Sequence, residues 1–155
     1  LVQALSATSM ELMAEMSTVD LANLAWGHAT MARHDEALLD AIADRALAKL
    51  SEFGSQDLSI TVWSFAKLAH GDGHFFEALG DASVVKIHEF GAQSLGNTGW
   101  AFAKRQILLP TLMEAVSAAT CVRVREMKPQ QLSNLVWAFA TLNVADERLV
   151  QAIAA

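Results

Sequence analysis

Four tryptophans divide this sequence evenly, because each lies 37 residues after the one before it. The same shift aligns many other apolar positions. The aligned sets are Trp26, Trp63, Trp100 and Trp137; Met16, Phe53, Phe90 and Met127; Leu21, Leu58, Leu95 and Leu132; and Ala29, Ala66, Ala103 and Ala140. A repeat of this length indicates an array of one small structural unit, so the fold is expected to arise by stacking copies of that unit.

The alignment also predicts where the units begin and end. Residues 1–15 correspond to the second half of a unit, residues 16–52, 53–89 and 90–126 to full units, and residues 127–155 to a partial unit. Terminal units of such arrays normally carry a polar outer surface, whereas both ends of this sequence are rich in Leu, Val and Ala. We therefore expect residues 1–155 to be one continuous array, a segment of a longer protein with further repeats at both ends.

Each unit is expected to contain two helices. The first helix is predicted over about residues 57–69 of the second full unit, where Leu58, Val62 and Phe65 recur with helical spacing and form one apolar face. Two helices of this size cannot bury both of their faces alone, so neighbouring units must cover them. The predicted fold is all-α, an α-solenoid of helix-turn-helix repeats with a 37-residue period.

Several residues are suited to ending or starting these helices. Aspartates precede the second helices, and prolines suit a first helical turn. Glycine is suited to a left-handed residue that ends a helix. The predicted N-caps are Thr18, Ser55, Asp35, Asp72 and Asp146, the predicted first-turn prolines are Pro110 and Pro129, and the predicted left-handed residues are Gly54 and Gly91.

The tryptophans allow two interpretations. Trp63 falls about 140° around the first helix from Leu58, at the edge of the apolar face. An aromatic residue at a fixed repeat spacing usually packs between neighbouring units, so we expect all four tryptophans to be structural core residues. The alternative is that they are platforms on which nucleotide bases stack.

Two units depart from the common pattern. His28 replaces the phenylalanine of the other units, and we expect it to be a hydrogen-bonded core imidazole. The unit at 90–126 has Gly96 and Gly99 inside its first helix, and Arg105 where other units have leucine. Because glycine weakens a helix, this unit is expected to be either the least stable one or a place of very close packing.

The formal net charge is −6, and it is unevenly distributed. Residues 1–52 carry a net charge of −5, residues 53–89 carry −3, and residues 90–155 carry +2. Proteins that hold nucleic acid through its phosphates usually present a basic face. The overall charge is therefore evidence against RNA binding.

No motif for catalysis or for a cofactor stands out in the sequence. The segment His70 to His74 contains two histidines and Asp72, but it lies in a predicted loop and does not recur in the other units. Phosphate-binding glycine loops and nucleophile motifs are not recognisable. We expect no enzymatic activity, no cofactor, no metal site and no membrane-spanning helix.

The segments Leu21 to Trp26 and Gln131 to Leu142 resemble heptatricopeptide repeats, which are related to octotricopeptide repeats and to the helical part of FAST-kinase-like and RAP-domain proteins. The resemblance covers the whole chain. It implies a non-enzymatic helical-repeat protein of a mitochondrion or plastid that binds single-stranded RNA in processing, stability, translation or ribosome assembly. The RNA-facing residues that it implies are Asn23, Lys67, Asn97, Lys104, Arg105 and Asn134. Because solenoids also bind proteins, the alternative function is a scaffold or structural subunit that holds other protein subunits of an organellar assembly.

Overall fold

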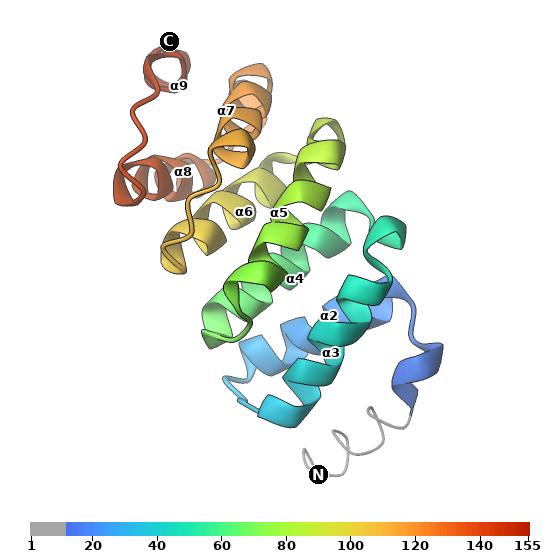
Figure 1. Cartoon of the computed structure of the whole chain (residues 1–155). Coiled ribbons are helices and arrows are strands. Elements are labelled where there is room, and N and C mark those ends of the chain that lie inside the picture. The colour runs from blue at the N-terminus through green and yellow to red at the C-terminus, as the bar shows by residue number, and fades with distance from the viewer. Residues whose placement is uncertain (1–11) are drawn as a thin grey trace.

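The computed structural model describes residues 12–155 (Figure 1). The first helices are α2 (Thr18–Thr30), α4 (Ser55–Leu68), α6 (Ala92–Lys104) and α8 (Pro129–Thr141). The second helices are α3 (Glu36–Ala48), α5 (Gly73–Lys86), α7 (Pro110–Arg123) and α9 (Glu147–Ala154). A short 3-10 helix precedes each first helix: η1 (Met13–Glu15), η2 (Leu50–Glu52), η3 (Ile87–Glu89) and η4 (Val124–Glu126). These residues contain no strand, so the all-α prediction is confirmed for them.

The helices form two layers. Figure 1 shows α3, α5 and α7 side by side in front of the first helices. Each first helix packs along the next one, from α2 through α4 and α6 to α8. Successive first helices begin 37 positions apart, and so do successive second helices. The assignment to the α-solenoid class and the unit boundaries stay predictions, and the predicted half-unit at 1–15 lies mostly outside the described residues.

The helix starts follow local hydrogen-bonding chemistry. Asp35, Asp72 and Asp146 cap the second helices as predicted, each accepting the amide N–H three residues later at 2.8–3.1 Å. Pro110 and Pro129 occupy first turns, also as predicted. The four remaining predictions are wrong. The N-caps Ser17 and Gly54 lie one residue before the predicted Thr18 and Ser55. Gly54 and Gly91 are N-caps with extended backbone, and not left-handed residues that end a helix.

The cap of α2 also fixes a carboxylate. The Ser17 hydroxyl donates to Asp20 Oδ2 at 2.6 Å, and the Ser17 backbone N–H donates to the same oxygen at 2.9 Å. These two hydrogen bonds lower the pKa of Asp20 below its ordinary value of 3.8. A lowered folded-state pKa means that the stabilising contribution is present at neutral pH and is lost as the pH falls through that pKa.

The first helices end in a left-handed residue that is never glycine. Ala32, Ala69, Gln106 and Asn143 have φ angles of 51–55°. The residue after each of them donates its amide to a carbonyl five residues earlier, as His70 N does to Phe65 O at 3.0 Å. This is the hydrogen bond of a Schellman motif, in which glycine normally takes the left-handed position. The chain therefore accepts backbone strain at each of these turns, most clearly at the two alanines.

The hydrophobic core runs between the two layers. Phe65, Phe76 and Phe102 are fully buried, and the Phe76 and Phe102 rings meet edge to face at 5.8 Å. The core also includes Leu21, Leu38, Leu39, Ile42, Leu58, Leu79, Leu95, Leu112, Val116 and Leu135. Leucines and phenylalanines that align in the repeat thus form a continuous apolar layer.

Small residues line the contact between successive first helices. The side of each first helix that meets the next one carries Thr18, Ala22, Ala25 and Ala29 on α2, Ser55, Ser59, Val62 and Ala66 on α4, and Ala92, Gly96, Gly99 and Ala103 on α6. Thr18 Oγ1 donates to Asp57 Oδ2 at 3.1 Å, and the hydroxyls of Ser59 and Ser94 are 3.0 Å apart. We call this row of contacts the first-helix seam.

The glycines of α6 belong to this seam. A Cβ atom at Gly99 would lie 2.8 Å from Leu135 Cδ2, and one at Gly96 would lie 3.5 Å from Gln131 Cα. Both glycines are buried. The sequence analysis gave two explanations for these glycines, low stability and close packing. The structure supports close packing, because α8 approaches α6 at the two positions that have no side chain.

Basic side chains tie the second helices to the turns before the first helices. Lys49 Nζ donates to Met16 O at 2.9 Å, and Lys86 Nζ donates to Phe53 O. Arg123 Nη2 donates to His88 O at 3.4 Å. Three of the positive charges therefore have structural roles that the sequence analysis did not recognise.

His28 is buried, as expected, with 4% of its surface exposed. Its Nδ1 atom, however, has no hydrogen-bond partner among the described residues. The expectation of a hydrogen-bonded imidazole is therefore wrong for this atom. A buried polar atom without a partner loses its water without replacement, which costs about 1–3 kcal/mol.

We predict that His28→Phe stabilises the protein by about 1 kcal/mol, because it removes the unpaired nitrogen and restores the phenylalanine found at the aligned positions 65, 102 and 139. Urea unfolding followed by circular dichroism measures the change. His28→Leu is the control for loss of polarity with less ring packing. A lower midpoint for His28→Phe than for the wild type would contradict this account.

We predict that Ala69→Gly raises the free energy of unfolding by about 1 kcal/mol, since it relieves the left-handed strain at an exposed site. The matched control is Ala118→Gly, at an exposed position inside α7, which is expected to lower stability by about 1 kcal/mol. The same unfolding assay compares them. Equal destabilisation by both substitutions would show that position 69 carries no strain.

Candidate nucleic-acid interface

The first helices share one face that points away from the second helices. On α4 this face carries Gln56, Ile60 and Lys67, with Trp63 at its edge. The aligned residues are Val19, Asn23, Trp26 and Thr30 on α2, Gln93, Asn97, Trp100 and Lys104 on α6, and Gln130, Asn134, Trp137 and Thr141 on α8. All of them are exposed or half-buried. We call this surface the first-helix face.

Amide side chains order part of this face. Gln93 Nε2 donates to Asn97 Oδ1 at 3.0 Å, and Gln130 Nε2 makes the same bond to Asn134 Oδ1. Gln131 Nε2, from α8, donates to Gln93 Oε1 at 3.1 Å and so links two helices. The carbonyl oxygens of Asn97 and Asn134 are thereby held in place, while their amide N–H groups are directed elsewhere and can donate to a ligand.

The inner two tryptophans are engaged within the protein. The rings of Trp63 and Trp100 lie 6.3 Å apart at an angle of 38°, and both are half-buried. Lys67 Nζ lies 4.8 Å from the centre of the Trp63 ring, at a distance typical of a cation–π contact. These two indoles fit the expected packing between units.

The outer two tryptophans do not belong to the core. Trp26 is 49% exposed and Trp137 is 44% exposed, so the prediction that all four are core residues is wrong for this pair. All four tryptophans lie at the edge of the apolar face of a first helix, about 140° from the core leucine. The Trp63 and Trp100 rings pack against each other there, whereas Trp26 and Trp137 have no such aromatic partner among the described residues.

Arg105 does not face RNA as predicted. Its Nη2 atom donates to Gly71 O at 2.9 Å, and its guanidinium carbon lies 5.3 Å from the centre of the Phe76 ring. The side chain is half-buried. It therefore joins the end of α6 to the loop before α5, and the prediction of an RNA-facing Arg105 is wrong. The other predicted residues, Asn23, Lys67, Asn97, Lys104 and Asn134, all lie on the first-helix face.

The charges are segregated between the two layers. Exposed carboxylates of the second helices are Glu36, Asp40, Asp44, Glu77, Asp81, Glu114 and Glu147. The first helices carry two carboxylates, Asp20 and Asp57, and both accept hydrogen bonds at the seam or a cap. Lys67 and Lys104 are exposed on the first-helix face. Most of the acidity that argued against RNA binding thus lies on the second helices and their caps, while Glu15, Glu52, Glu89 and Glu126 lie on the 3-10 helices that precede the first helices.

The histidine segment of the loop before α5 has a structural contact. His70 Nε2 lies 2.7 Å from Asp40 Oδ1 of α3, and its ring meets that of His34 edge to face at 5.3 Å. Within residues 12–155, no group of three or more potential ligands is arranged to hold a metal ion. The same part of the chain has no helix long and apolar enough to span a membrane.

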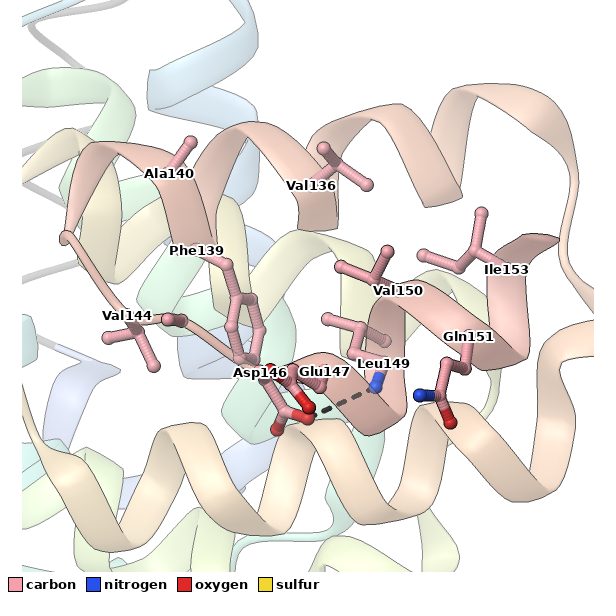
Figure 2. Close-up of a pocket in the computed structure, with 11 residues that line it drawn as sticks. Val136, Phe139, Ala140, Val144, Asp146, Glu147, Leu149, Val150, Gln151 and Ile153 are labelled. Carbon is pink, nitrogen blue, oxygen red and sulfur yellow. Dashed lines mark hydrogen bonds between the residues drawn. The ribbon is translucent and has the colours of Figure 1, made fainter.

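A second surface feature lies between α8 and α9. An apolar groove of about 380 Å³ lies there. Val136, Phe139, Leu149, Val150 and Ile153 line it, and Figure 2 shows them together with the capping bond from Leu149 N to Asp146. Val136 is 49% exposed, whereas the aligned Ala25, Val62 and Gly99 are buried under the next first helix.

The paired helices and their amide-rich first-helix face define an all-helical protein built from helix pairs. A family model described as RNA-editing substrate-binding complex 6 protein matches residues 1–147, and the chain belongs to that family. No curated protein matches the chain. The family match supports an RNA-processing helical protein, and the narrower resemblance to heptatricopeptide and octotricopeptide repeats is not confirmed by it.

We predict that Arg105→Ala lowers the free energy of unfolding by about 1–3 kcal/mol, because it removes the bond to Gly71 O and the stem that covers Phe76. Arg105→Leu is the matched variant, since Leu68 and Leu142 occupy the aligned positions. It is expected to lose less stability than Arg105→Ala in the same urea titration. Wild-type stability of Arg105→Ala would contradict the structural role.

Proposed function

We propose that this protein is a non-enzymatic subunit of an RNA-editing assembly that holds single-stranded RNA on its first-helix face. The family is named for an RNA-editing substrate-binding complex, which supports an RNA-related role. The observation that carries the proposal is the segregation of charge, which leaves Lys67 and Lys104 on a face with amides and indoles while the second helices carry the carboxylates.

The chemistry of this face suits unpaired bases. Single-stranded RNA is recognised by stacking on aromatic rings and by hydrogen bonds to base edges, and uncharged amides can make such bonds. Two exposed lysines supply few phosphate contacts, so the binding should be moderate and less dependent on salt than that of strongly basic proteins. We further propose that the helix pairs are a segment of an α-solenoid that acts in a mitochondrion; the family match gives no support to a plastid.

RNA binding is tested by fluorescence anisotropy with a labelled pool of random single-stranded RNA, titrated across salt concentration. We expect binding at low salt. Lys67→Gln and Lys104→Gln should each weaken it and reduce the slope of log K against log salt by about 0.7, the value for one phosphate contact in single strands. Both lysines are exposed, so the fold should be retained.

Arg148→Gln is the charge-matched control, because Arg148 lies on the second helix α9 with 74% of its side chain exposed. It should leave both affinity and slope unchanged. No binding by the wild type at low salt would overturn the proposed function. Equal losses for Arg148→Gln and Lys67→Gln would overturn the assignment of the face.

A second candidate function is a scaffold for other protein subunits, and the apolar groove between α8 and α9 favours it. The aligned surfaces of α2, α4 and α6 are each covered by a helix of this chain. A helix with small and aliphatic side chains, from a partner subunit or from a further unit of the same chain, would fit the groove in the same way. The discriminating result is an association that resists ribonuclease and is lost in Val136→Lys, which lines the groove.

A further inference from the structure

Two rows of exposed side chains cross the second helices. The acidic row is Asp40, Glu77 and Glu114, and the apolar row is Ala48, Val85 and Val122. Within each row the residues are 37 positions apart, one on each of α3, α5 and α7. On every helix the apolar residue follows the acidic one by eight positions. This spacing keeps both on one side of the helix, about 12 Å apart along its axis.

The exposure of these rows does not depend on where the sequence begins or ends. Helix α5 contacts α3 on one side and α7 on the other, and Figure 1 shows it between them. Glu77 and Val85 of α5 are nevertheless exposed, Val85 over 72% of its surface. Neighbouring helix pairs therefore leave both rows uncovered.

The carboxylates of the acidic row are available to a ligand. Within residues 12–155, Glu77 and Glu114 form no ion pair, and Asp40 contacts His70 with 71% of its side chain still exposed. The basic residues of these helices are directed to backbone carbonyls of the turns before the first helices, as Lys86 is to Phe53 O. The same holds for Arg45, Lys49 and Arg123. The exposed side of the second helices is therefore negatively charged and complementary to a basic partner.

The valines of the apolar row have no role in the core. Val122 is 85% exposed, and Val85 is nearly as exposed. Valine is also a weaker helix former than the alanine that occupies the aligned position 48. Two aligned valines beside a row of carboxylates form a mixed surface, with the apolar and charged contacts that protein interfaces combine.

We infer that the acidic and apolar rows together dock an amphipathic helix of a partner protein, with Lys or Arg along one edge and aliphatic residues along the other. Neighbouring helix axes lie about 8–10 Å apart, so each row offers one contact per 8–10 Å. Two turns of an α-helix advance about 11 Å, so the partner helix meets successive contacts with residues seven positions apart. The distance between the rows is about the diameter of one helix.

The experiment is fluorescence anisotropy with a labelled synthetic helix of about three heptads that carries Lys and Leu, each at heptad spacing, on the two edges of one face. The wild type should bind it. Glu77→Gln combined with Glu114→Gln is expected to weaken binding by about 2- to 30-fold, the range for two exposed ion pairs.

Val85→Ala combined with Val122→Ala tests the apolar row. It is expected to weaken binding of the same peptide by about 5-fold or more, because less apolar surface is buried. The urea midpoint of this variant should not fall, since alanine is the better helix former. Wild-type affinity of this variant for the peptide would overturn the role of the apolar row.

Glu89→Gln combined with Glu126→Gln is the charge-matched control. These exposed glutamates are also 37 positions apart, but they lie on the 3-10 helices η3 and η4, outside both rows. The control should bind the peptide as the wild type does, and a peptide with Lys and Leu in shuffled order should bind the wild type more weakly. Equal losses for the two glutamate pairs, or no binding by the wild type, would overturn the docking surface.

A second copy of this chain is the competing occupant, because Lys67 and Lys104 are exposed and also 37 positions apart. Sedimentation velocity of the chain alone separates the two. A monomer is expected. A dimer that is lost in the Glu77→Gln and Glu114→Gln variant would overturn the partner helix and assign the rows to self-association. RNA takes no part in these measurements, so a failure of the proposed RNA binding would leave this inference standing.

Discussion

The close contact between successive first helices is the interaction on which the rest of the structure depends. Small residues at every third or fourth position allow the helices to lie against one another, and at Gly96 and Gly99 the side chains are absent altogether. The seam holds four first helices in one layer, and that layer creates the first-helix face. A larger residue in the seam would move a helix and, with it, every side chain that the helix presents.

Much of the fold follows from the repeat. The 37-residue alignment predicts the second-helix caps Asp35, Asp72 and Asp146, because each capping signal is local and recurs. The first helices begin one or two residues earlier than predicted. The prediction failed there because Gly54 and Gly91 suit either the end of a helix or an N-cap. The left-handed turns at Ala32 and Ala69 carry no glycine, so no sequence signal identifies them.

The candidate site was harder to predict, for a physical reason. Whether a side chain faces solvent depends on residues about one unit away in the sequence, across a helix contact. Arg105 matches a positively charged RNA contact by type, yet its guanidinium reaches Gly71 O of the neighbouring helix pair. Trp26 matches a core aromatic by spacing, yet about half of its surface is exposed. Lys67 and Lys104 are exposed on the first-helix face, on the side of their helices opposite the apolar face. Their contact with RNA stays a prediction.

The central claim is that RNA contacts the first helices and avoids the second helices. Photo-cross-linking to single-stranded RNA that carries 4-thiouridine, followed by mass spectrometry of the cross-linked peptides, tests it most directly. The account predicts cross-links in α2, α4, α6 and α8. Cross-links confined to α3, α5 and α7, whose exposed faces carry the carboxylates, would contradict it.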